Sequence, residues 1–138
     1  MERFQLHEQL AADCHWIGDL ALSSVLLLND SRYPWIVLVP RRIRLREVYQ
    51  LDKEDRQHFL EESCRAGEFM MGAFDGEKLN MGALGNLVPQ LHLHLVVRYR
   101  ADPAWPGPVW GHSPAVAYES SLLDSRLRLL RDGLGLAD

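Results

Sequence analysis

The sequence predicts an α+β fold with a mostly antiparallel β-sheet, one long helix and a short C-terminal helix. Apolar runs of strand length stand on both sides of a long segment with helical periodicity. Strands and helices do not alternate regularly, so a parallel sheet built from βαβ units is not indicated. The chain has 138 residues, of which 47% are hydrophobic and 25% charged, which is typical of one globular domain. We therefore expect a single domain over residues 1–138.

The first expected element is an antiparallel hairpin over residues 23–40. The run SSVLLLND (23–30) is apolar and ends in Asn29 and Asp30, which favour turns. The run PWIVLVP (34–40) is rich in β-branched and aromatic residues and is bracketed by prolines, which cannot continue a central strand. Two such runs joined by a short connection predict neighbouring strands.

A long amphipathic helix is expected from residue 53 to about residue 74, after a segment (45–51) that is compatible with one helical turn. Asp52 stands at the N-cap position, and acidic residues follow it in the first turn, where they complement the helix dipole. Apolar residues then recur at three- and four-residue spacing, which predicts one buried face. The residues of that predicted face are Phe59, Leu60, Cys64, Gly67, Met70, Met71 and Phe74.

The second half of the chain predicts two more strands, a loop and a helix. The strands are EKLNMGAL (77–84) and LHLHLVVRY (91–99), and an irregular loop rich in proline and tryptophan follows over residues 101–114. The segment from residue 120 onward predicts a short amphipathic helix that ends at Gly133. Trp105 and Trp110 of the loop either form an exposed patch that a second copy of the chain covers, or pack on their own core.

Composition excludes several classes of function. The formal net charge is −4, and the only basic run, at residues 41–46, is too short for a nucleic-acid footprint. No apolar run approaches the roughly 20 residues that cross a bilayer, and the N-terminus lacks the pattern of a secretion signal. The chain has only two cysteines, Cys14 and Cys64, which are far apart and form no C-x-x-C pair, so we expect reduced thiols. We expect a cytoplasmic protein without nucleic-acid or membrane partners and without a structural zinc site.

The run PQLHLHLVVR (89–98) carries the strongest functional signal. Side chains alternate across a strand, so Gln90, His92 and His94 share one face while the intervening leucines share the other. The leucines are expected to pack on the long helix, which leaves the two imidazoles in a row, about 7 Å apart. Two histidines in register beside a glutamine favour a functional site over a structural one.

Three chemical interpretations fit this face. The two histidines could hold a metal ion, although no spacing singles out a third ligand among His112, Asp102 and Cys14. One histidine could act as a general base, but the sequence contains no nucleophile elbow for it to serve. A neutral imidazole could itself attack phosphorus, if a hydrogen bond fixes its other nitrogen.

The nucleophile interpretation also requires donors for the phosphoryl oxygens. Gln90, His94, Asn80 and Asn86 lie close enough in the sequence to supply them. This scheme needs no metal ion and no other cofactor.

The segment NMGALGNLVPQLHLHLVVR (80–98) resembles the signature of the histidine triad (HIT) family, in which three alternating histidines follow a glycine-rich turn and an asparagine-bearing strand. The run LLLNDSRYPWIVLVPRR (26–42) is similar to the family's nucleotide-binding hairpin, and the long helix falls between the two, as in the family. The loop DPAWPGPVWG (102–111) is similar to one in a bacterial subgroup of HIT-like proteins. The likeness spans roughly residues 20 to 111.

This resemblance implies a site and a reaction. His92 matches the nucleophile that becomes attached to a nucleoside monophosphate, and His94 matches the last histidine, which orders the phosphate site. Asn29 lies where the family contacts the ribose hydroxyls, and Asn80 lies where an asparagine borders the phosphate pocket. The implied protein is a nucleotide hydrolase or nucleotidyl transferase with this fold, and a homodimer.

Three positions depart from the family pattern. Gln90 replaces the first histidine; its amide donates and accepts hydrogen bonds but carries no charge. Leu87 stands where many members have a hydroxyl near the leaving group, and Asn86 replaces a glutamine. Two alternatives therefore stay open: a catalytically weak or inert nucleotide-binding protein of the same fold, and a metal-binding module that uses His92 and His94.

Overall fold

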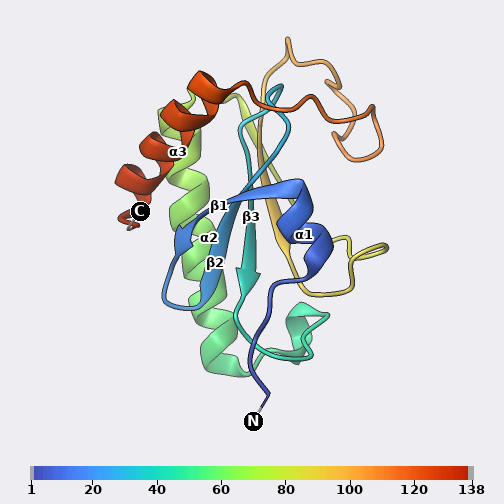
Figure 1. Ribbon diagram of the computed structural model, residues 1–138, viewed down its shortest axis with the longest axis vertical. Helices are drawn as coiled ribbons and strands as arrows, with labels where there is room; N and C mark the ends of the chain where they lie inside the picture. The colour runs from blue at the N-terminus through green and yellow to red at the C-terminus, as the bar shows by residue number, and fades with distance from the viewer. Residues whose placement is uncertain (1, 137–138) are drawn as a thin grey trace.

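The structure is a computed structural model that describes residues 2–136. In this part of the chain, short and long helices surround one antiparallel sheet (Figure 1). In chain order the elements are α1 (Glu8–Asp13), β1 (Cys14–Asp19), β2 (Ser23–Leu28), β3 (Trp35–Pro40), the 3₁₀ helix η1 (Val48–Gln50), α2 (Lys53–Ala73), β4 (Lys78–Gly82), β5 (Leu93–Arg98) and α3 (Ser120–Leu134).

The sheet confirms the predicted fold class. Its five strands lie in the order β1-β2-β3-β5-β4, and every neighbouring pair is antiparallel. The predicted hairpin is β2 and β3, in which Leu27 lies opposite Ile36. The centre of the sheet is therefore β3, which pairs with β2 on one side and with β5 on the other.

Helix α1 and strand β1 are elements that the sequence did not predict. Helix α1 has only six residues, too few for a periodic pattern to be read. In β1 the pairing register shifts between Trp16 and Gly18, which marks a β-bulge or similar irregularity. Such an irregularity breaks the two-residue alternation that identifies a half-buried strand, so β1 carries no clear sequence signal.

Helix α2 begins where the sequence predicted, because the Asp52 side chain caps it by accepting a hydrogen bond from the backbone N–H of Asp55. Its predicted buried face was partly wrong. Leu60 and Cys64 are exposed, whereas Ser63 and Ala66 are buried against the sheet. The Ser63 hydroxyl donates to the carbonyl of Leu60, so its burial leaves no unpaired polar group.

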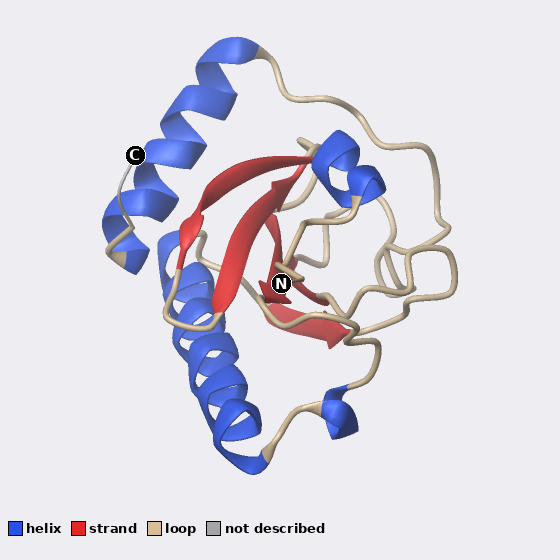
Figure 2. Ribbon diagram, turned by 60° about the horizontal axis from the view of Figure 1, so that its bottom comes forward, coloured by secondary structure: helices blue, strands red, loops and turns tan. Residues whose placement is uncertain are grey.

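Two hydrophobic cores lie on opposite faces of the sheet. Helices α2 and α3 cover one face, and α1 covers part of the other (Figure 2). Strand β5 serves both cores, because Leu95 and Val97 belong to the first and Val96 to the second. His94 is on the Val96 face, so the histidines and the leucines point to opposite sides, as the alternation predicted.

Helix α3 extends two residues beyond its predicted end. Gly135, not Gly133, ends the helix in the left-handed conformation (φ 69°), which glycine adopts without strain. Gly133 lies inside the helix, where a Cβ atom would come within 1.9 Å of Cζ of Phe69. The glycine at 133 therefore allows α3 to pack closely on Phe69 of α2, and it does not form a turn.

Candidate active site

A cavity of about 570 Å³ opens on the sheet face opposite α2 and α3. Most of its wall is apolar, and four polar side chains interrupt it: those of Asp30, Asn86, His92 and Ser113. A largely apolar pocket with a few polar groups is the usual form of a small-molecule site. The lining residues are Leu28, Asp30, Trp35, residues 84–88, His92, residues 109–111, Ser113 and Ala115.

His92 is the imidazole on the wall of this cavity. It is 7% exposed, and its Nδ1 lies 2.7 Å from the backbone carbonyl oxygen of Gln90. A carbonyl oxygen only accepts hydrogen bonds, so Nδ1 carries the proton in this contact. The lone pair of the neutral ring is then on Nε2. This is the tautomer that a nucleophilic imidazole needs.

His94 lies behind His92 and does not line the cavity. The centroids of the two rings are 4.9 Å apart, closer than the roughly 7 Å expected from the backbone spacing, and His92 precedes the first residue of β5. The indole Nε1–H of Trp35 donates to Nδ1 of His94 at 2.9 Å. Because Trp is only a donor, His94 Nδ1 is unprotonated and the ring hydrogen is on Nε2.

The surroundings of His94 oppose a charge. Burial and, as the smaller cause, the neighbouring His92 together lower the pKa of His94 to about 4. The rings of Trp35 and Trp110 contact it edge-on, each with its centroid 5.6 Å away. Protonation of Nδ1 would also end the hydrogen bond from Trp35. His94 is therefore a neutral side chain at physiological pH, with its Nε2–H in a fixed position.

This burial predicts a pH dependence of stability. Between about pH 6.5 and pH 4 the unfolded chain binds a proton at His94 that the folded chain does not, so stability falls as pH falls through this window. The loss from pH 7.5 to pH 5 is expected to be about 2 kcal/mol. Urea unfolding at the two pH values measures it. A His94→Gln variant should lose this part of the pH dependence; an identical dependence in both proteins would contradict the assignment.

Gln90 does not face the cavity. Its side-chain Oε1 accepts from the backbone N–H of His7 at 2.8 Å, and its Nε2 donates to the carbonyl of Gln5 at 2.9 Å. These contacts occupy both ends of the amide. The backbone carbonyl of Gln90, not its side chain, contacts His92.

Of the three predicted asparagines, only Asn86 lies in the cavity wall. The side chain of Asn29 accepts from the backbone N–H of Tyr118 at 3.0 Å. The side chain of Asn80 accepts from Nη1 of Arg98 at 2.7 Å. Both of these asparagines therefore make hydrogen bonds within the protein away from the cavity lining.

Asp30 is a cavity residue that the sequence analysis did not single out. Its side chain is buried and forms an ion pair with Arg32, whose Nη2 lies 2.9 Å from Oδ2. Alternation continued past the end of β2 indicates only that Asn29 and Asp30 point to opposite sides: Asp30 shares its parity with the cavity residue Leu28, and Asn29 shares the parity of Leu27 in the other core. Arg32 also bonds Ser113, which joins this turn to the far side of the cavity.

A buried ion pair holds the loop that forms one side of the cavity. Arg98 donates to both carboxylate oxygens of Asp102, at 2.8 and 3.0 Å, and both side chains are almost fully buried. Arg98 also bonds the carbonyl of Gly107 and lies over the ring of Trp105. This network fixes residues 101–114, a segment without helix or strand as predicted, and with it the position of Trp110.

The same network controls the ionisation of Asp102. Burial by itself raises the pKa of this carboxyl, but the hydrogen bonds from Arg98 and from the backbone N–H groups of Tyr99 and Trp105 outweigh burial and lower the pKa to about 2. Asp102 is therefore a carboxylate at physiological pH and is ion-paired with Arg98.

The residues considered as a third metal ligand lie in other surroundings. Cys14 is buried in the second hydrophobic core, Asp102 is paired with Arg98, and Nδ1 of His112 bonds the Ser113 hydroxyl. Within residues 2–136, no group of three or more His, Cys, Asp or Glu side chains is arranged to hold a metal ion.

Comparison with known families identifies the architecture. The model of the HIT domain matches residues 9–101, which include the hairpin, α2 and the two histidines. The chain belongs to the HIT-domain family. A search of curated proteins gave no match.

Solved structures of HIT proteins superpose on nearly the whole chain. A histidine triad protein from Marinobacter aquaeolei is 52% identical, with a TM-score of 0.95 over 99% of this chain and 100% of the other. Histidine triad proteins from Bradyrhizobium japonicum and Sinorhizobium meliloti are 39% and 38% identical, with TM-scores of 0.94 and 0.92. They cover 96% and 94% of this chain, and 99% and 96% of their own. In this HIT-domain chain, none of the described helices is both long and apolar enough to cross a membrane.

Proposed function

We propose that this HIT-domain protein binds a nucleotide derivative and hydrolyses it, or transfers its nucleotidyl group, through a covalent intermediate on His92. One observation carries this function: the contact of Nδ1 with the Gln90 carbonyl leaves the lone pair on Nε2 of an imidazole that lines the cavity. A neutral imidazole with its second nitrogen fixed is a nucleophile at neutral pH.

The reaction has two steps. First, Nε2 of His92 bonds to the α-phosphorus while the bond from phosphorus to the leaving group breaks, and the leaving group takes up a proton from solvent water. The Nδ1–H remains bonded to the Gln90 carbonyl, which stabilises the positive charge on the ring. Water then attacks phosphorus and loses a proton to solvent as the P–N bond breaks, so that His92 returns to its neutral form and a nucleoside monophosphate is released.

The neighbours of His92 supply the setting for these steps. We propose that backbone N–H groups of residues 86–94 donate to the phosphoryl oxygens. His94, whose hydrogen is held on Nε2 by the bond from Trp35 to its other nitrogen, packs behind His92 and supports its ring. Asn86 adds a side-chain amide in the cavity wall. For the ribose hydroxyls we propose Asp30 in place of Asn29, because the carboxylate of Asp30 lies in the wall and accepts hydrogen bonds.

The charge of the cavity favours one kind of leaving group. Among the described residues, no lysine or arginine lines it, and Asp30 is its only charged residue. Polyphosphates are normally held by cationic side chains or metal ions. We therefore propose a nucleoside phosphoramidate, which has a single phosphate and an amine leaving group, as the substrate class.

The decisive experiment looks for the intermediate. The protein is incubated with adenosine 5′-phosphoramidate, quenched during turnover, digested and analysed by mass spectrometry, while release of AMP is followed in parallel. A nucleoside monophosphate mass on the peptide that contains His92 is expected. A dinucleoside polyphosphate serves as the comparison substrate and should react more slowly.

An inert nucleotide-binding protein is the second candidate, favoured by the absence of a hydroxyl at Leu87, which is 96% exposed at the cavity. Saturable nucleotide binding without AMP release or an adduct would establish it. The metal-binding alternative is tested by elemental analysis of the purified protein, with the His92/His94 double variant as the control.

A homodimer, a cytoplasmic location and membership of a bacterial subgroup with glutamine at the first triad position remain proposals. Trp105 and Trp110 are half-buried against their own chain, which is the second of the two arrangements that the sequence left open. Large exposed apolar side chains lie instead on β4 and the loop after it: Met81, Leu84 and Leu87. A second copy of the chain would have to cover these residues.

A further inference from the structure

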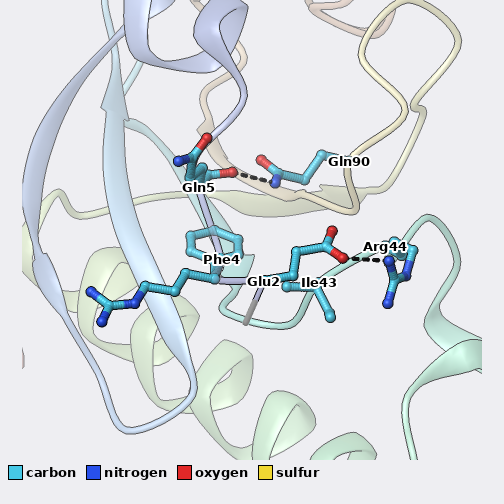
Figure 3. A pocket seen from close by; sticks show the side chains of 7 residues that line it. Glu2, Phe4, Gln5, Ile43, Arg44 and Gln90 are labelled. Carbon is cyan, nitrogen blue, oxygen red and sulfur yellow. Dashed lines mark hydrogen bonds and ion pairs between the residues drawn. The ribbon is translucent and has the colours of Figure 1, made fainter.

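The side-chain amide of Gln90 makes two hydrogen bonds to the backbone that a neighbouring β-strand normally makes. It accepts from the N–H of His7 and donates to the carbonyl of Gln5, the two backbone groups that flank residue 6 (Figure 3 shows the bond to Gln5). In a parallel sheet, the backbone of one residue makes this same pair of bonds across its neighbour. The amide of Gln90 therefore attaches the N-terminal segment, residues 5–7, as a strand partner would.

The backbone of Gln90 orients the imidazole of His92. The peptide unit between Gln90 and Leu91 has its N–H bonded to the carbonyl of Leu45 at 2.8 Å and its C=O bonded to Nδ1 of His92 at 2.7 Å. A trans peptide is planar, with N–H and C=O pointing in opposite directions. Fixing the N–H on Leu45 therefore aims the carbonyl at His92.

This peptide unit lies outside the sheet. Strand β5 begins at Leu93, and its first partner on β3 is Leu38, so Gln90 and His92 receive no support from the ladder. Leu45, the other anchor, lies in the irregular segment between β3 and η1. Within the described part of the chain, the side chain of Gln90 and the carbonyl of Leu45 thus attach the segment whose carbonyl orients His92.

We propose that Gln90 is a positioning residue for His92. Its side chain holds residues 5–7 against this segment, and the attachment keeps its carbonyl directed at Nδ1, so that Nε2 stays unprotonated and aimed into the cavity. This role rests on the proposed function of His92 as the nucleophile. It also gives a reason for glutamine at this position: an amide has its donor and acceptor side by side, whereas the two nitrogens of an imidazole diverge and cannot both reach one extended segment.

Two substitutions at Gln90 test the amide. Gln90→Leu keeps the volume and removes both hydrogen bonds; Gln90→Glu keeps the acceptor but places a carboxylate against the Gln5 carbonyl. In each variant kcat for a nucleoside phosphoramidate should fall about tenfold while KM changes less than about twofold, because orientation of the nucleophile is lost and the substrate contacts are not. If a Gln90 substitution only lowered the fraction of folded protein, kcat per active site would be unchanged.

The tautomer of His92 distinguishes a positioning role of Gln90 from a merely structural one, because only a positioning role affects it. Imidazole ¹⁵N NMR distinguishes Nδ1–H from Nε2–H, and the wild-type protein should show His92 with its proton on Nδ1 alone. In Gln90→Leu the spectrum should show a mixture of the two forms. This measurement needs no substrate, so it decides the role of Gln90 even if the wild-type protein proves to have no hydrolase activity.

The hydrogen bond from His7 to Gln90 can also be removed by substituting His7. His7→Pro removes the N–H that bonds Gln90, and φ of His7 is −55°, which proline accepts. His7→Ala keeps that N–H but removes the ring, whose Nδ1 accepts from the backbone of Gln9 at the start of α1, so it is the matched control.

His7→Pro should lower kcat and mix the His92 tautomers, whereas His7→Ala should do neither. The His7→Pro/Gln90→Leu double variant should be no worse than Gln90→Leu alone. If Gln90→Leu does not fold, the pair of His7 variants decides. A pure Nδ1–H tautomer in Gln90→Leu or in His7→Pro would overturn the positioning role.

Discussion

The His92→Ala variant is expected to release no measurable nucleoside monophosphate from a phosphoramidate, a loss of at least about a thousandfold in kcat. The proposed reaction proceeds through a bond from phosphorus to Nε2, and no other imidazole lines the cavity among the described residues. His94, the nearest candidate, lies outside the lining, and its Nδ1 is occupied by Trp35.

The fold should survive this substitution. His92 precedes β5, and its one described hydrogen bond is to the Gln90 carbonyl, so its removal takes away no part of the sheet ladder. Circular dichroism and thermal unfolding check this point. His58→Ala is the matched control, because His58 is exposed on α2 and does not line this cavity. Substantial turnover by His92→Ala would rule out the covalent mechanism.

The largest loss of stability is expected from Asp102→Asn. This change leaves the Arg98 guanidinium buried without a counter-ion, which costs about 3–5 kcal/mol when one partner of a buried ion pair is removed. Three backbone N–H groups, those of Tyr99, Ala104 and Trp105, donate hydrogen bonds to the Asp102 carboxylate. The asparagine amide is a weaker acceptor for these bonds. Chemical denaturation at neutral pH measures the difference in unfolding free energy.

An exposed ion pair between the residue before β4 and a residue just after β5 provides the control. Glu77 and Arg100 lie 3.4 Å apart, but the side chain of Arg100 is 81% exposed, and such pairs contribute less than about 1 kcal/mol. Glu77→Gln should therefore change stability by less than about 1 kcal/mol. Equal losses in Asp102→Asn and Glu77→Gln would show that the Arg98 network does not hold the loop.

The two buried groups act in different pH ranges. The contribution of neutral His94 to the free energy of unfolding is fully present above about pH 6.5 and is lost as pH falls to about 4. The contribution of ionised Asp102 is fully present above about pH 4 and is lost as pH falls to about 2. For both groups the unfolded chain binds the proton more readily, so the protein becomes less stable as pH falls.

Local sequence patterns determined most of the elements. Apolar runs bounded by turn residues and prolines predicted the hairpin of β2 and β3, and Asp52 with its acidic neighbours predicted the start of α2. Alternation of side chains separated His94 from the leucines on β5. These features depend on φ, ψ and side-chain direction within a few residues, so a short window of sequence contains them.

The positions of individual site residues needed the tertiary structure. Asn29 and Asp30 are both polar and adjacent, and only the pairing of β2 with β3 decides which of them faces the cavity. In the same way, a helical repeat predicts an amphipathic face but not its exact centre, which is why Leu60 proved exposed and Ser63 buried. The position of the sheet relative to α2 sets that centre.

The sequence by itself determined that an imidazole at residue 92 stands in an alternating strand-like run, within a chain of the HIT type. Only the tertiary structure decided what surrounds it: the amide of Gln90 is bound by backbone groups 83 and 85 residues away, and a tryptophan 59 residues away fixes the hydrogen on His94. Side-chain direction is a local property of the backbone. The hydrogen-bond partner that selects a tautomer comes from wherever the fold brings another segment, and no local pattern contains it.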